Sequence, residues 1–173
     1  MKLSWSHKLF LRVNESVGEH PKLDSFMIFS AKWLIYFVSI FSVLWVMFNF
    51  QGRDILNTVI KSSVSVGVLY GVSLIIAVIV RKPRPEIELP QIKRLVHTIG
   101  IWKSFPSDHT GVSFLLVFLL LIFGLSIYLG LFLFIIASII AVSRVYVGVH
   151  YPRDILGGFV LALFISFLYL VFI

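Results

Sequence analysis

Long apolar stretches, separated by short polar segments, dominate the chain. They cover about residues 26–50, 55–80, 110–149 and 152–173. A helix that crosses a bilayer needs about 20 predominantly apolar residues. The stretch 110–149 is therefore long enough for two helices, and glycines at 124–130 mark the expected turn between them. The pattern predicts an all-α integral membrane bundle of five transmembrane helices, or six.

A shorter amphipathic pattern precedes the first span. Within residues 7–20, Leu9, Phe10, Val13 and Val17 recur at helical spacing, with charged side chains on the other faces. This pattern is typical of an N-terminal helix that lies in the membrane interface. The alternative is an exposed helix packed on the rest of the protein.

The composition excludes several classes of protein. Apolar residues make up 59% of the chain and charged residues 13%, against about 45–50% and 25% in soluble domains. We therefore expect residues 1–173 to form a single membrane-embedded domain rather than a water-soluble globule. The first 25 residues lack the apolar core of a signal peptide, so the first span should insert without cleavage. Without cysteine, the chain has no disulfide, thiolate ligand or cysteine nucleophile.

The net charge of +7 indicates an anionic partner. With five spans, one side of the membrane collects 12 of the 15 basic residues: Lys2, Lys8, Arg12, Lys22, Arg81, Lys82, Arg84, Lys93, Arg94, Lys103, Arg144 and Arg153. Lys32 and Lys61 interrupt predicted spans and are expected to reach an interface. Because the basic residues lie close to the membrane and form no recognisable nucleic-acid module, we expect lipid or phosphate partners and no nucleic acid.

Three polar clusters lie on that side, at the ends of predicted spans. They are RKPRP at 81–85, FPSDHT at 105–110 and SRVYVGVHYPRD at 143–154. Ionisable groups at a membrane boundary are costly to bury and commonly functional. Their shared content of arginine, lysine, two histidines and an aspartate suits a phosphoryl group.

The clusters contain the groups that bind phosphate in proteins. Phosphoryl transfer spreads charge over three equatorial oxygens, and arginine binds such oxygens with two parallel hydrogen bonds. Arg84 and Arg144 are the leading candidates, with Lys82 as an additional point charge. Ser107 follows Pro106 and is predicted to be a helix N-cap. The N–H groups beside it and the positive end of the helix would form an anion site.

The same clusters contain groups for catalysis. Histidine can act as a nucleophile or as a general acid near neutral pH, so His150 and His109 could divide these roles. Asp154 is expected in the first turn of the last span. From there it would accept the imidazole N–H of His150, fix its tautomer and stabilise the cation.

Two of these segments resemble signatures of the type 2 phosphatidic acid phosphatase (PAP2) superfamily, which are K-x6-RP, PSGH and SR-x5-H-x3-D. The third signature is complete, at Ser143, Arg144, His150 and Asp154. The second matches at Pro106, Ser107 and His109, with Asp108 in place of glycine. The first matches only at Arg84 and Pro85, because Ala77 occupies the lysine position; Lys82 or Arg81 is the candidate replacement.

The resemblance implies further expectations. His150 would be the nucleophile that forms a phosphohistidine, His109 the general acid, and no metal or other cofactor would be required. The PRP, FPSDHT and GxHYPxD segments are most similar to bacterial undecaprenyl-diphosphate phosphatases of the bacitracin-resistance type. Members that act on phosphatidylglycerophosphate or on the 1-phosphate of lipid A are the alternatives. The superfamily implies a multi-pass protein of the cell membrane with an extracytoplasmic active site, whereas the basic excess favours the cytoplasmic side.

Two other classes of protein remain open at this point. A metal-dependent hydrolase could use His109, His150, Asp108 and Asp154 as ligands. A noncatalytic transporter or lipid-binding protein would explain the spans and the charge, but not the combination of Arg144, His150 and Asp154. The pattern does not indicate an oligomeric state.

Overall fold

The computed structural model describes residues 3–97 and 102–172, and these ranges are entirely helical apart from turns and loops. This confirms the all-α prediction. The helices are α1 (Trp5–Glu15), α2 (Pro21–Lys32), α3 (Leu34–Asn49), α4 (Arg53–Val80), α5 (Pro85–Glu88), α6 (Asp108–Ile122), α7 (Ile127–Tyr146) and α8 (Pro152–Phe172).

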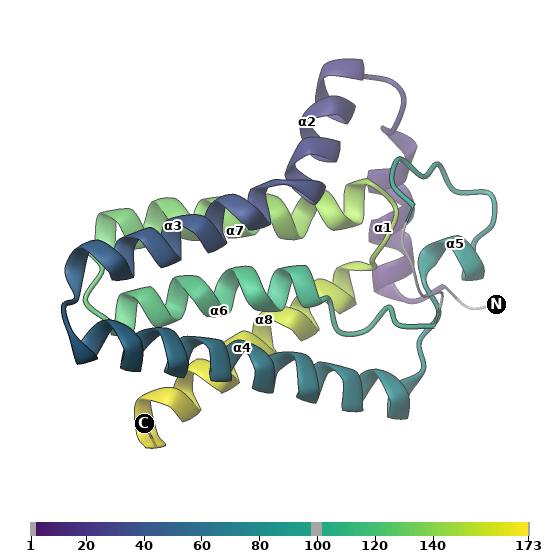
Figure 1. The fold of residues 1–173 in the computed structure, drawn as a ribbon. Coiled ribbons are helices and arrows are strands. Elements are labelled where there is room, and N and C mark those ends of the chain that lie inside the picture. The colour runs from purple at the N-terminus through teal and green to yellow at the C-terminus, as the bar shows by residue number, and fades with distance from the viewer. Residues whose placement is uncertain (1–2, 98–101, 173) are drawn as a thin grey trace.

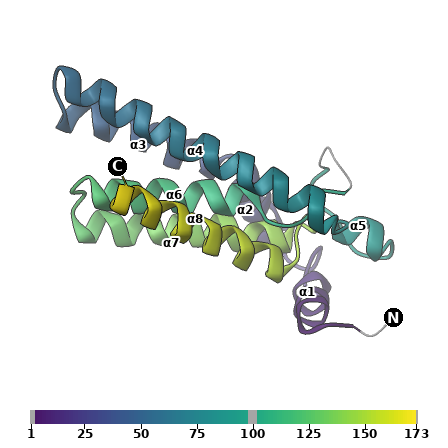
Figure 2. The same cartoon turned by 90° about the horizontal axis from the view of Figure 1, so that it is seen from below.

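Helix α6 lies at the centre of the bundle, in contact with α3, α4, α7 and α8 (Figures 1 and 2). Its residues are apolar on nearly all sides, and Leu115, Leu119 and Leu120 are buried. The surrounding helices instead expose large apolar side chains, such as Phe48 on α3 and Ile79 on α4. An apolar core with an apolar exterior is the arrangement expected of a helical membrane protein.

By helix length and composition, fewer of the described segments qualify as membrane spans than the five that the sequence predicted. Within residues 3–97 and 102–172, three segments are long and apolar enough to cross a membrane: α4 with α5, α7 and α8. The pair α2 and α3 makes a fourth if it counts as one span. Helix α6 has 15 residues, or about 22 Å at 1.5 Å per residue, against a hydrocarbon core of about 30 Å. The count of five spans is therefore not confirmed.

The first predicted span is broken. Helices α2 and α3 meet at Trp33 with a bend of 45°, so residues 26–50, predicted as the first span, are divided between two helices. The guanidinium of Arg144, on α7, donates a hydrogen bond to the carbonyl oxygen of Ala31 at 3.0 Å. A side chain that takes a helix carbonyl in this way bends the helix.

Helix α1 packs on the rest of the protein. It ends at Glu15, before the predicted end at residue 20. Phe10 is fully buried, and its ring lies 5.2 Å from that of Tyr151. The opposite face exposes Trp5 and Leu9. The structure shows a helix packed on the rest of the protein, with an exposed apolar face of the kind that interfacial helices have.

The two ends of the bundle differ, as Figure 1 shows. Helices α1 and α5 and the loop between α7 and α8 lie at one end, and the α3–α4 and α6–α7 turns at the other. The described residues of the predicted basic set belong to segments at the first of these ends, and Lys2 lies outside the described residues. The α6–α7 turn is shorter than predicted, because Ser126 caps α7 and leaves Gly130 inside that helix.

Candidate active site

A cavity of about 600 Å³ opens at the end of the bundle where the basic residues gather. Its walls come from the α2–α3 break, from the segment that joins α4 to α6, from the start of α6, from the end of α7 and from the α7–α8 loop. The polar side chains that line it include Arg84, Lys103, Asp108, His109, Arg144 and His150. Segments far apart in the sequence thus meet around one volume.

His150 is buried in the loop between α7 and α8. Its Nδ1 lies 2.9 Å from the carbonyl oxygen of Ser104. Because a carbonyl can only accept, Nδ1 carries the hydrogen and Nε2 keeps its lone pair. Gly148 has a φ of +86°, and a Cβ there would lie 3.1 Å from the carbonyl oxygen of Lys93. Glycine is therefore required in the turn that carries His150 into the cavity.

Asp154 lies behind His150, in the first turn of α8, and is fully buried. Its Oδ2 accepts from the hydroxyl of Ser104 at 2.6 Å and from the N–H of Tyr151 at 2.8 Å. The same oxygen is 3.7 Å from Nδ1 of His150, beyond hydrogen-bonding distance. The hydrogen bond predicted between the two side chains is therefore corrected: the nearer acceptor for His150 is the Ser104 carbonyl.

The pKa of His150 depends on its burial and on the charged side chains around it. Burial lowers the pKa of His150 below its usual value, and the positive charge of Arg144 acts in the same direction, whereas the Asp154 carboxylate opposes both. The net direction is downward, so the imidazole is neutral near pH 7. A neutral imidazole with a free lone pair is the form that can act as a nucleophile.

Backbone carbonyls hold two guanidinium groups at the cavity. Arg84, at the N-cap of α5, donates to the carbonyl oxygen of Val149 at 3.1 Å. Arg144, in the last turn of α7, donates to that of Ala31. The Nε of Arg144 is buried and has no hydrogen-bond acceptor among the described residues. Since a neutral carbonyl positions the guanidinium of Arg144, its positive charge remains available to an anion.

Two predicted phosphate ligands lie outside the cavity lining. Ser107 precedes α6 as predicted, but its N–H donates to the carbonyl oxygen of Asp154 and its hydroxyl accepts from Thr110. A Cβ at Gly158 would lie 2.5 Å from the Ser107 carbonyl oxygen, so α8 packs directly on this residue. Lys82 is exposed, and its carbonyl oxygen accepts from Ser104. Neither side chain is among the described residues that line the cavity.

Two residues that sequence reasoning did not single out belong to the site. Ser104 joins His150 to Asp154, one contact through its carbonyl and one through its hydroxyl. Lys103, which the sequence placed only among the basic residues of one side, lines the cavity beside Asp108. Their only signal in the sequence is their position immediately before the FPSDHT segment, because nothing in a loop pattern shows where its side chains point.

The two aspartates have partners within the protein. Asp108 contacts Lys103 and Ser73, and Asp154 contacts Ser104 and Tyr151. No group of three or more histidine, aspartate or glutamate side chains that could hold a metal ion occurs within residues 3–97 and 102–172.

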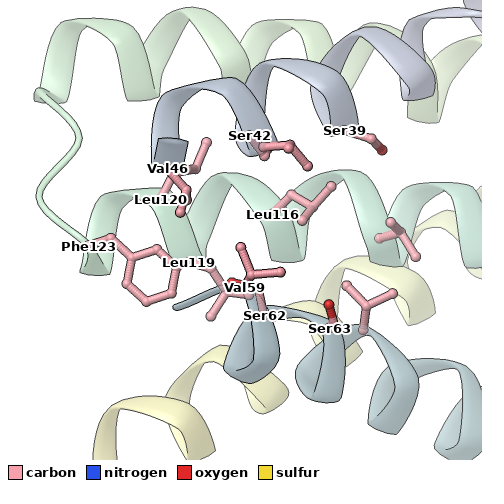
Figure 3. Close-up of a pocket in the computed structure, with 13 residues that line it drawn as sticks. Ser39, Ser42, Val46, Val59, Ser62, Ser63, Leu116, Leu119, Leu120 and Phe123 are labelled. Carbon is pink, nitrogen blue, oxygen red and sulfur yellow. The ribbon is translucent and has the colours of Figure 1, made fainter. Parts of the chain in front are cut away.

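An apolar pocket of about 330 Å³ lies next to the cavity, between α3, α4 and α6 (Figure 3). Valines and leucines line most of it, and the small side chains of serines on α3 and α4 leave its volume unfilled. Tyr36 and His109 line the polar cavity; Ser39 and Val112, three residues further along the same helices, line the apolar pocket. Residues at this spacing share a helix face, so the pocket begins about one helical turn beyond the cavity along α3 and α6.

Comparison with known proteins identifies the family. The family model of the PAP2 superfamily matches residues 58–173, which contain every side chain that contacts His150 or Asp154 above. The chain belongs to the PAP2 superfamily. This PAP2 protein is 35% identical to the candidate undecaprenyl-diphosphatase YbjG of Escherichia coli (strain K12) over 151 residues, which cover 87% of the chain and 73% of YbjG.

Other relatives of this PAP2 protein include two from Bacillus. The undecaprenyl-diphosphatase BcrC of Bacillus subtilis (strain 168) is 28% identical over 168 residues, which cover 95% of the chain and 82% of BcrC. The bacitracin transport permease protein BcrC of Bacillus licheniformis is 29% identical over 151 residues, with coverage of 86% and 71%.

Two crystal structures share the fold. LpxE of Aquifex aeolicus has a TM-score of 0.80 at 23% identity and covers 99% of the chain and 98% of LpxE. The first transmembrane PAP2-type phosphatidylglycerolphosphate phosphatase from Bacillus subtilis has a TM-score of 0.69 at 21% identity, with coverage of 99% and 87%. These likenesses and the exposed apolar helices establish a membrane protein of the PAP2 fold.

Proposed function

We propose that this protein hydrolyses undecaprenyl diphosphate to undecaprenyl phosphate and inorganic phosphate at the membrane surface. The observation that carries the proposal is one cavity lined by His109, His150, Arg84 and Arg144. Sequence similarity to undecaprenyl-diphosphatases supports the choice of substrate.

In the first step, Nε2 of His150 attacks the terminal phosphorus. An N–P bond forms while the bond from phosphorus to the bridging oxygen breaks, and the electron pair stays on that oxygen. Burial and the nearby Arg144 lower the pKa of His109 to about 3 in the free protein, and the negative charge of the bound diphosphate raises it again. His109 therefore takes up a proton together with the substrate and donates it to the departing oxygen, so undecaprenyl phosphate leaves. Arg84 and Arg144 neutralise the charge that spreads over the equatorial oxygens of the transferred group.

In the second step, water attacks the phosphohistidine. His109, now neutral, accepts a proton from that water. The N–P bond breaks, its electron pair returns to Nε2 of His150, and inorganic phosphate leaves. The carbonyl oxygen of Ser104 holds the imidazole in the same tautomer through both steps. Asp154 positions Ser104 through its hydroxyl, and its carboxylate stabilises the ring when the ring carries positive charge.

The apolar pocket favours a lipid over a soluble phosphate ester. It follows the polar cavity along α3 and α6. A phosphate held by Arg84 and Arg144 would therefore have space for the start of its own hydrocarbon chain.

Phosphate release from a substrate panel tests the proposal. The purified protein is assayed with undecaprenyl diphosphate, phosphatidylglycerophosphate, phosphatidic acid and lipid A 1-phosphate, after exhaustive chelation. We expect the highest kcat/KM with undecaprenyl diphosphate. Preference for another lipid would contradict the substrate, and activity lost on chelation and restored by a metal would support the metal-dependent alternative.

Replacement of the nucleophile separates catalysis from binding or transport. His150→Ala should lower kcat by about 10⁴-fold while thermal unfolding stays unchanged. Wild-type protein quenched with labelled substrate should hold acid-labile phosphate on His150. Full activity in the variant, or phosphate trapped on another residue, would exclude the mechanism.

We propose an extracytoplasmic active site in the cell membrane. The chain has no cysteine, so single cysteines can be introduced without background. His97→Cys, beside the cavity, should react with a membrane-impermeant maleimide on intact cells. Gln51→Cys, in the α3–α4 turn at the other end, should react only after lysis. The reverse result would place the site in the cytoplasm.

A further inference from the structure

Lys103 and Asp108 form an ion pair inside the phosphate cavity. Nζ of Lys103 lies 2.7 Å from Oδ2 of Asp108, and both residues line the cavity. The other carboxylate oxygen, Oδ1, accepts from the hydroxyl of Ser73 on α4 at 2.5 Å. Asp108 is therefore fixed from two sides, and through it the ammonium group is fixed as well.

The ammonium group of Lys103 has more N–H donors than Asp108 accepts from. An ammonium group has three N–H donors, and Lys103 directs one of them to Asp108. With about a fifth of each side chain exposed, the pair stays open to the cavity. A carboxylate alone at this place would repel a phosphate; paired with Lys103 it instead positions a cation.

The pair is close to both catalytic histidines along the chain. Lys103 immediately precedes Ser104, whose carbonyl oxygen accepts from His150. Asp108 immediately precedes His109 in the first turn of α6. The two arginines approach from other elements, α5 and α7. The cavity thus has a third cation that is independent of the arginines.

A diphosphate ester needs such a cation more than a monophosphate ester does. When the terminal phosphoryl group moves to His150, the bond to the bridging oxygen breaks and its electron pair remains on the lipid phosphate. The negative charge of that leaving group therefore grows, and a fixed cation beside it stabilises the transition state. A monophosphate ester has no second phosphoryl group for this cation to bind.

We infer that Lys103, positioned by Asp108, binds the phosphoryl group that stays on the lipid and gives the enzyme its preference for diphosphates over monophosphates. The inference rests on the proposed function, because it assumes that His150 attacks the terminal phosphorus.

Two short substrates that have the same farnesyl tail test this inference. Farnesyl diphosphate and farnesyl monophosphate differ by a single phosphoryl group. Lys103→Gln should lower kcat/KM for the diphosphate by about 10- to 100-fold and for the monophosphate by less than about 3-fold. Lys103→Arg should restore most of the diphosphate activity. Lys22→Gln removes the same charge from an exposed site on α2 and should change neither rate.

A double-mutant cycle separates direct binding from simple neutralisation of Asp108. If Lys103 binds phosphate, Lys103→Gln should still impair diphosphate hydrolysis in an Asp108→Asn background. If that loss disappears, or if both esters lose equally in the single variant, the inference is wrong although the proposed function stands. Wild-type protein that releases phosphate from neither farnesyl nor undecaprenyl diphosphate would overturn the proposed function, and the inference with it.

Discussion

Ser104 contacts both His150 and Asp154, although 46 and 50 residues separate it from them in the sequence. Its carbonyl oxygen lies 2.9 Å from Nδ1 of His150, and its hydroxyl lies 2.6 Å from Oδ2 of Asp154. All three residues are buried. One residue thus connects the proposed nucleophile to the carboxylate that stabilises it.

Removal of the Ser104 hydroxyl should impair catalysis without unfolding the protein. Ser104→Ala keeps the carbonyl contact with His150 but leaves Oδ2 of Asp154 with one donor fewer. A hydrogen bond to a charged group contributes about 1.5–3 kcal/mol, so kcat should fall by about 10- to 100-fold. Ser138→Ala, which removes a hydroxyl bonded within α7, is the matched control. Equal kcat in the two variants would contradict the role of Ser104.

The pH dependence of kcat/KM should follow the protonation of His150. Because burial lowers the pKa of His150, the ring stays neutral to a lower pH than a free histidine, whose pKa is about 6.5. As the pH falls through the lowered pKa, the ring gains a proton and can no longer attack. The acid limb of the profile should therefore lie below pH 6.5.

The variant Asp154→Asn tests whether the acid limb of the pH profile reports the protonation of His150. Removal of the negative charge withdraws a contribution that raises the pKa of His150, so the acid limb should move to still lower pH while kcat decreases. A limb that moves upward, or that stays in place, would show that another group titrates.

The close packing of α8 on α6 should be sensitive to a single methyl group. A Cβ at Gly158 would lie 2.5 Å from the backbone oxygen of Ser107, which cannot move aside as a flexible side chain does. Gly158→Ala should destabilise the fold by about 1–3 kcal/mol and lower activity, because Ser107 also contacts Asp154. In contrast, Gly71→Ala on α4 meets no atom within 4 Å. Thermal unfolding in detergent compares the two variants.

Filling the apolar pocket should affect long-chain substrates most. Ser62 lines the pocket, so Ser62→Phe should block space that a prenyl chain would use (Figure 3). We expect kcat/KM for undecaprenyl diphosphate to fall by about 10-fold or more, and that for farnesyl diphosphate to change less. Val64→Phe, on an exposed part of α4, is the control. An equal loss on both substrates would mean that the chain lies elsewhere.

Much of the architecture could be predicted from the chain because it depends on local pattern. Apolar runs of helical length predicted the helices, and the placement of polar clusters at their ends predicted that His109, His150, Arg84 and Arg144 would share one side. Pro152, which suits the first turn of a helix, also placed Asp154 in the first turn of α8. These features depend on neighbours within a few turns of one helix.

Other features depend on contacts between distant segments, and only the tertiary structure decided them. The bend at Trp33 accompanies a hydrogen bond from Arg144, 113 residues away from Ala31. Ser107 lies behind the cavity because α8 packs on it at Gly158, and Lys103 rather than Lys82 lines the cavity because of how the loop before α6 folds. Helical periodicity determines which face a residue occupies, whereas a loop side chain takes its direction from the segments packed around it.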